Sequence, residues 1–255
     1  MSKNYLGYGS NLSGKYMAER VPNKIKAILE HLDFLEGEGE LPKDEKALWS
    51  MKVGDEYEKM LKDYLDGNAT KTELRRYFGA YLENLGLTRK HLKKLLGASQ
   101  KYTDAISESR KRGILEGYHL VINKIFEKNP KQGYANIVET SPDVVEAIRN
   151  GELVGVILPW VEGAVYEIPD EFWVILEMTE GIHKDKPHYH EMRVTVKVNN
   201  RDVQVVTFAA NPDKTGYGIY PTKSYKDKIL EGRDLFSPKY LQEVERMPTY
   251  EEAVR

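Results

Sequence analysis

A change in hydrophobic period near Gly113 constrains the fold more than any other feature of this sequence. Over residues 20–112 the apolar side chains recur at three- and four-residue spacing, as Leu74 and Phe78 do, which is typical of amphipathic helices. After Gly113 the chain has short runs rich in β-branched residues, such as residues 161–168. The sequence therefore predicts a helical segment followed by a mixed unit of strands and helices.

One expected strand lies before the helical segment. The apolar run at residues 4–8 leads into Gly9-Ser10-Asn11, which indicates a buried strand that ends in a tight loop. A helix should start near Ser13, and Pro22 suits the first turn of a helix. Strands on both sides of the helices indicate an interrupted unit.

We therefore expect two domains. Residues 1–19 and 113–255 should form one discontinuous domain, and residues 20–112 should form an all-helical insertion domain. A chain of 255 residues is long enough for both to bury a core.

The composition excludes several classes of protein. The sequence has no cysteine, which excludes disulfides, thiolate metal sites, iron–sulfur clusters and a cysteine nucleophile. No apolar stretch approaches the roughly 18–20 residues that span a bilayer, so no membrane association is expected. The first residues lack a basic region followed by an apolar one, so we expect a cytoplasmic protein.

Charge is distributed unevenly along the chain. Residues 70–112 hold eleven basic and four acidic side chains, a net charge of +7, whereas the remainder carries −9 from 27 basic and 36 acidic side chains. A basic block in an acidic chain indicates units with different partners.

The Gly9-Ser10-Asn11 turn could form an anion site. Successive backbone N–H groups after a strand can point into one pocket and hold a carboxylate or a developing oxyanion. The turn lacks the glycine and lysine spacing of nucleotide-binding loops, which favours a small anionic ligand. A plain surface turn is the alternative.

Glu180 is the candidate general base. It ends a strongly apolar segment and precedes Gly181. Partial desolvation there would raise the pKa of the carboxyl toward neutrality, which would make it a usable general base. Glu177 is a weaker rival, and a surface glutamate at a helix end is the alternative reading of Glu180.

Several segments together, in this order, resemble the gamma-glutamylcyclotransferase family and its AIG2-like relatives. The matching segments are Tyr8–Leu12, Gly117–Leu120, Val161–Tyr166, Leu176–Gly181, Tyr189, Val203–Ala209, Pro221 with Tyr225, Ile229–Gly232 and Ser237–Leu241. Each alone is weak, and their order over residues 4–19 and about 113–247 is specific.

The resemblance implies an α+β fold, a mixed β-barrel with flanking helices, interrupted here by the all-helical insertion. It implies an enzyme that releases 5-oxoproline and a free amine from a small gamma-glutamyl substrate, with Glu180 as general acid and base and no metal or cofactor. Tyr225 would close the pocket. The implied substrate loop consists of Tyr5, Leu6, Gly7, Tyr8, Gly9, Ser10 and Asn11.

The chain departs from the family in two places. Glu177 stands where the family usually has aspartate, and ordinary members lack the insertion of residues 20–112. The insertion could act as a lid, as an oligomerisation module or as an inert segment. Homodimers are common among such small barrels, and the apolar residues do not decide between a monomer and a dimer.

Residues 85–106 within the insertion resemble the helix-turn-helix of phage-repressor-type proteins. The second helix would offer Gln100, Lys101 and Thr103 to the major groove, and Arg110 would meet phosphates. The alternative function is therefore a DNA-binding or regulatory protein whose cyclotransferase-like pocket senses a metabolite.

A metal site is a minor alternative. His188 and His190 alternate along an expected strand and share one face, but no third ligand is clearly placed. A partly exposed hairpin is the favoured explanation of this pattern.

Overall fold

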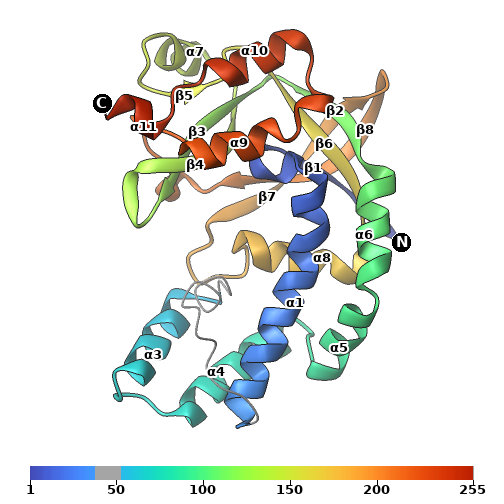
Figure 1. The fold of residues 1–255 in the computed structure, drawn as a ribbon, viewed down its shortest axis with the longest axis vertical. Coiled ribbons are helices and arrows are strands. Elements are labelled where there is room, and N and C mark those ends of the chain that lie inside the picture. The colour runs from blue at the N-terminus through green and yellow to red at the C-terminus, as the bar shows by residue number, and fades with distance from the viewer. Residues whose placement is uncertain (38–52, 255) are drawn as a thin grey trace. The chain divides into compact units, whose positions relative to one another are not determined.

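The computed structural model describes residues 1–37 and 53–254, and these fall into two compact units (Figure 1). The first, called the helical unit here, comprises Met1 and the described residues of 18–37, 53–104 and 169–189. The second, called the barrel unit, comprises residues 2–17, 105–168 and 190–254. The expected domain bounds, with residues 20–112 inserted into a domain of residues 1–19 and 113–255, stay a prediction.

Amphipathic helices build the helical unit. Its core includes Tyr57, Leu74 and Phe78, each at most 2% exposed. The Thr70 side chain accepts a hydrogen bond from the backbone of Glu73 and its backbone N–H donates to the Glu73 carboxylate, which fixes the start of one helix. The helices are α1 (Gly14–Glu36, in this unit from residue 18), α3 (Asp55–Leu65), α4 (Lys71–Asn84), α5 (Arg89–Gly97), α6 (Ser99–Ser109, in this unit to residue 104) and α8 (Asp170–Glu180).

The expectation that Pro22 lies in the first turn of a helix is wrong. Pro22 lies inside α1, which runs unbroken from Gly14 to Glu36. A proline cannot donate to the carbonyl four residues earlier, here that of Ala18. The Thr103 hydroxyl of α6 donates to this carbonyl at 3.5 Å, so tertiary packing supplies a partner that the helix lacks.

The barrel unit is built on a closed barrel with the strand order β1-β6-β2-β7-β8. The first strand pairs in parallel with the last, with Tyr5 opposite Val206. The middle strands pair antiparallel, with Gly113 opposite Gly163. The barrel strands are β1 (Ser2–Gly7), β2 (Lys111–Glu116), β6 (Trp160–Pro169), β7 (Tyr189–Val198) and β8 (Arg201–Ala210).

A second sheet and several short helices complete this unit. The sheet has the order β4-β3-β5, from β3 (Tyr118–Phe126), β4 (Asn129–Glu139) and β5 (Val154–Gly155). The helices are α7 (Pro142–Arg149), α9 (Lys223–Leu230), α10 (Pro238–Arg246) and α11 (Tyr250–Ala253). The predicted α+β class with a barrel and flanking helices is confirmed.

A buried carboxylate ties three elements of the barrel unit together. Glu162 of β6 is 1% exposed and accepts hydrogen bonds from Arg112 of β2 at 2.7 Å and from Trp160 Nε1 at 3.1 Å. It also accepts from the backbone N–H and the hydroxyl of Ser237, at 2.6 and 2.7 Å. Because Ser237 is the N-cap of α10, Glu162 fixes the start of that helix.

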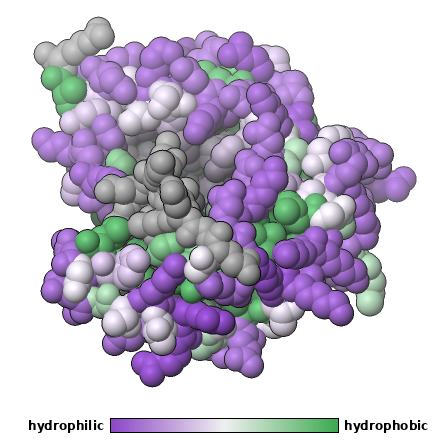
Figure 2. Space-filling view, turned by 60° about the horizontal axis from the view of Figure 1, so that its bottom comes forward, coloured by the Kyte–Doolittle hydropathy of each residue, from purple (hydrophilic) through white to green (hydrophobic). Residues whose placement is uncertain are grey.

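Hydrophilic residues cover most of the face seen in Figure 2. No helix among the described residues combines the length and apolar character that crossing a membrane requires.

Candidate functional site

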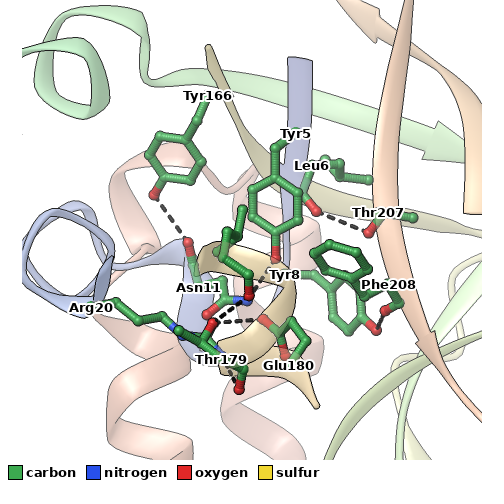
Figure 3. Close-up of polar contacts among 11 residues, drawn as sticks. Tyr5, Leu6, Tyr8, Asn11, Arg20, Tyr166, Thr179, Glu180, Thr207 and Phe208 are labelled. Carbon is green, nitrogen blue, oxygen red and sulfur yellow. Dashed lines mark hydrogen bonds and ion pairs between the residues drawn. The ribbon is translucent and has the colours of Figure 1, made fainter. Parts of the chain in front are cut away.

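The predicted substrate loop lies at the end of β1. Tyr5 and Leu6 are at most 1% exposed, and the chain then enters a 3-10 turn at Gly9–Leu12. The Thr207 hydroxyl donates to the Leu6 carbonyl at 2.9 Å, which holds this strand against β8 (Figure 3). The Tyr8 hydroxyl donates to the Phe208 carbonyl on the same neighbouring strand.

Side-chain hydrogen bonds hold the turn in place. The Asn11 amide donates to the Tyr5 hydroxyl at 2.7 Å. The Tyr166 hydroxyl of β6 donates to the carbonyls of Asn11 and Leu12, at 3.0 and 3.2 Å. Residues of the Tyr8–Leu12 and Val161–Tyr166 motifs therefore fix the loop, together with Tyr5.

Tyr225 of α9 reaches the same loop. Its hydroxyl accepts from the Ala135 N–H at 3.0 Å and would lie 2.8 Å from a Cβ at position 9. Burial raises the Tyr225 pKa to about 12, against the opposing effect of hydrogen bonds with Ala135 and Ser10. Tyr225 therefore stays a neutral phenol against the Gly9-Ser10 backbone.

Gly9 needs to be glycine for two reasons. Its φ of +60° is a left-handed conformation that L side chains rarely adopt, and a Cβ would also meet Ala135 Cβ at 2.8 Å. Gly7 is likewise close-packed, since a Cβ there would lie 2.8 Å from the Asn11 carbonyl oxygen. The barrel unit thus brings together all the predicted substrate-loop residues and Tyr225.

Glu180 lies in the helical unit, as the last residue of α8. It is 6% exposed, and Gly181 ends the helix in the left-handed conformation. Its Oε1 forms an ion pair of 2.6 Å with Nη1 of Arg20 from α1, and Arg20 Nη2 donates to the Thr179 carbonyl at 3.3 Å (Figure 3). The reading of Glu180 as an exposed helix-end residue does not fit this burial.

Sequence reasoning missed Arg20. Its neighbours Met17, Val21 and Ile25 are fully buried on α1, and Lys24 is 6% exposed. Two cations within the buried stripe of a helix are unusual, because buried charges need partners. That pattern was the available signal for a buried acid elsewhere in the chain.

Glu177 has its own partners. Its Oε1 accepts from Trp173 Nε1 at 2.7 Å, and its Oε2 lies 3.0 Å from His183 Nε2. Both oxygens are therefore engaged in a network that links α8 to the segment after it.

The residues named as DNA contacts have partners within their units. Lys101 pairs with Glu171 at 2.5 Å, and the Gln100 amide donates to Asp104 at 2.7 Å. Thr103 donates to the Ala18 carbonyl, as described above.

Arg110, in the barrel unit, donates to both oxygens of Asp234 at 2.5 and 2.9 Å and to the Leu12 carbonyl at 3.1 Å. The DNA-binding alternative stays a prediction.

The two histidines considered as metal ligands fall in different units. His190 Nδ1 lies 2.8 Å from Asn211 Oδ1. Across residues 1–37 and 53–254, no group of three or more histidine or acidic side chains is placed to hold a metal ion.

A comparison of the sequence with family models finds a match in the segment that carries several of these motifs. Residues 160–243 match the AIG2-like family. This segment includes the Val161–Tyr166 motif, Glu180, Pro221 and Tyr225. The match confirms the resemblance to the AIG2-like family over these residues.

The solved structures that this chain is similar to share little sequence identity with it. One, described as a gamma-glutamyl cyclotransferase, has 14% identity and a TM-score of 0.42 over 55% of this chain and 73% of its own. An uncharacterized protein from Homo sapiens has 14% identity and a TM-score of 0.43 over the same shares. YkqA from Bacillus subtilis has 19% identity and a TM-score of 0.44, over 62% of this chain and 51% of its own. No curated protein matches the sequence.

Proposed function

We propose that this protein is an enzyme of the gamma-glutamylcyclotransferase type. It would release 5-oxoproline and a free amine or amino acid from a gamma-glutamyl substrate. The observation that carries the proposal is the AIG2-like match over residues 160–243, which includes both Glu180 and Tyr225.

The geometry of the loop supports this proposal. A cyclisation needs a substrate held in a folded conformation, since orientation supplies much of the rate. Side-chain hydrogen bonds hold the Tyr5–Asn11 loop, and Tyr225 packs against it through Gly9 and Ser10. Backbone groups of such a loop suit the glutamyl part of a substrate and a developing oxyanion.

Glu180 would act as the proton shuttle. The substrate α-ammonium loses a proton to the Glu180 carboxylate, and its nitrogen attacks the γ-carbonyl carbon, forming the new C–N bond. Glu180 returns a proton to the leaving nitrogen as the old C–N bond breaks. In all, the α-nitrogen loses two protons and the leaving amine gains two, so the carboxylate is regenerated and no cofactor is consumed.

The test is release of 5-oxoproline from a panel of gamma-glutamyl dipeptides and amines. Glu180→Gln keeps the shape of the side chain and should lower kcat about 10²- to 10⁴-fold. Glu171→Gln, in the first turn of the same helix, should leave kcat within about twofold, because a single ion pair with partly exposed side chains contributes little.

Two results would contradict the proposal. The first is a folded wild-type protein that releases 5-oxoproline from no member of the panel. The second is full activity in Glu180→Gln with loss of activity in Glu177→Gln, which would move the shuttle to the rival carboxyl.

A further inference from the structure

Arg20 and Glu180 form a nearly buried ion pair within the helical unit. The exposed fractions of the two side chains are 11% and 8%, and Nη1 lies 2.6 Å from Oε1. The pair joins α1, which follows the substrate loop directly along the chain, to the end of α8.

The guanidinium spans two acceptors at the end of α8. While Nη1 meets the carboxylate, Nη2 donates to the Thr179 carbonyl at 3.3 Å. The last carbonyls of a helix have no donor within the helix, and a cation there also complements the helix dipole. The planar guanidinium group can donate to both acceptors at once, which a lysine ammonium cannot do in the same fixed geometry.

Burial makes the partner of each charge essential. An arginine stays protonated under all ordinary conditions, so in this location it favours the ionised form of the neighbouring carboxyl. A carboxyl can accept a proton only in its ionised form. The contact therefore does more than pack two helices.

We propose that Arg20 is a positioning residue for Glu180, an inference that rests on the proposed cyclotransferase function. Arg20 holds the carboxylate in one orientation at the end of α8 and keeps it ionised between turnovers. When Glu180 takes a proton from the α-ammonium, the ion pair loses its charge attraction. The return of that proton to the leaving nitrogen restores the attraction, so Arg20 favours the second transfer.

Other charged groups of the helical unit must be separated from this effect. Lys24 lies one turn beyond Arg20 on α1 and is buried. Glu177 lies one turn before Glu180 on α8, and its Oε2 lies 3.0 Å from Nε2 of His183. Lys24→Met and His183→Gln are therefore made beside the Arg20 variants.

The experiment compares Arg20→Met, Arg20→Lys and Arg75→Met, the last at an exposed position of α4. Their kcat and kcat/KM for 5-oxoproline release are measured from pH 4 to 9 on the best substrate of the panel. Carbon-13 NMR of the glutamate carboxyls gives the titration midpoint of Glu180 without any substrate.

In Arg20→Met we expect kcat to fall at least about tenfold and the acidic limb of its pH profile to move to higher pH, together with the NMR midpoint. In Arg20→Lys we expect the limb to stay in place and kcat to fall about tenfold with KM unchanged, because orientation is lost while charge is kept. Arg75→Met, Lys24→Met and His183→Gln should leave the limb where it is.

Three results would overturn the inference and leave the proposed function standing. One is an active Arg20→Met variant whose limb and midpoint stay at the wild-type pH. Another is a wild-type kcat in Arg20→Lys, which also serves if Arg20→Met does not fold. The third is a limb that moves equally in His183→Gln. An inactive, folded wild-type protein would instead overturn the proposed function itself.

Discussion

Single residues set the conformation of the loop that we assign to the substrate. At Gly9 the backbone conformation and the space both exclude a side chain, whereas Gly67 has a similar φ of +78° with no atom within 4 Å of a Cβ. The two glycines therefore form a matched pair. Both have a left-handed backbone, but only at Gly9 would a Cβ also meet neighbouring atoms.

We predict that Gly9→Ala lowers the free energy of unfolding by about 3 kcal/mol, from the left-handed strain together with the overpacking against Tyr225. Gly67→Ala should cost about 1 kcal/mol, because only the strain applies. Urea unfolding measures both. Equal losses in the two variants would mean that the contact of Gly9 with Tyr225 is not tight.

His31 gives the helical unit a pH dependence. It is fully buried among Phe34, Tyr57 and Phe78, with Nε2 hydrogen-bonded to the Tyr57 hydroxyl. Burial lowers the pKa of His31 from 6.5 to about 4. The unfolded chain therefore binds more protons than the folded one between these two pH values, and protonation favours unfolding.

The contribution of neutral His31 to the free energy of unfolding should be complete above pH 6.5 and lost as the pH falls to about 4. The loss should be about 3 kcal/mol at most. His31→Gln keeps a hydrogen-bonding group and cannot titrate, so its unfolding free energy should fall less steeply over this range. Urea titrations at half-unit pH steps measure the difference. Parallel curves for the two proteins would exclude His31 as the titrating group.

Among the elements of the barrel unit, β2, β6 and α10 meet at one carboxylate. Removing Glu162 would leave the Arg112 charge and the Ser237 N–H and hydroxyl without this acceptor. Glu167 lies on the same strand with its side chain exposed, which makes it the natural control.

We predict that Glu162→Ala lowers the free energy of unfolding by about 3–5 kcal/mol. Glu167→Ala should change it by no more than about 0.5 kcal/mol. Thermal and urea unfolding, followed by circular dichroism, test both. A tolerated Glu162→Ala would show that water replaces the carboxylate without cost.

The elements differ in how far the sequence predicts them. The strand before Gly9, the helix that ends at Glu180 and the Val161–Tyr166 strand follow from local period and glycine placement. The length of α1 does not, because Pro22 favours a helix start and only the distant Thr103 hydroxyl supplies the Ala18 carbonyl. Arg20 was missed for the same reason, since its partner is 160 residues away in sequence.

On the scale of the whole molecule, four of the eleven basic side chains of residues 70–112 form ion pairs with acidic side chains in the described part of the same chain. Arg89 contacts Asp33 and Glu36, and Lys101, Arg110 and Arg112 contact Glu171, Asp234 and Glu162 in their respective units. All these acids lie outside residues 70–112. Part of the positive charge of residues 70–112 is therefore paired with negative charge from the rest of the chain. This pairing weakens the inference of a nucleic-acid partner from net charge.

We predict that Arg110→Ala lowers the melting temperature by several degrees, since it leaves Asp234 and the Leu12 carbonyl without this donor. Retention of a fluorescent DNA duplex at increasing salt should be the same in wild type, Arg110→Ala and Lys101→Ala. A salt slope that falls by about one in each variant would instead support the DNA-binding alternative.

The course of α1 has a consequence for anyone who wishes to trim this protein to the residues of the proposed site. Cutting at residues 20 and 112, where the sequence pattern changes, would discard Arg20 while keeping Glu180. It would also strip α8 of Tyr102, which packs on Phe172 with ring centroids 5.2 Å apart, and of Lys101. A shortened chain would have to keep α1 through Arg20 and retain or replace the α6 residues that contact α8.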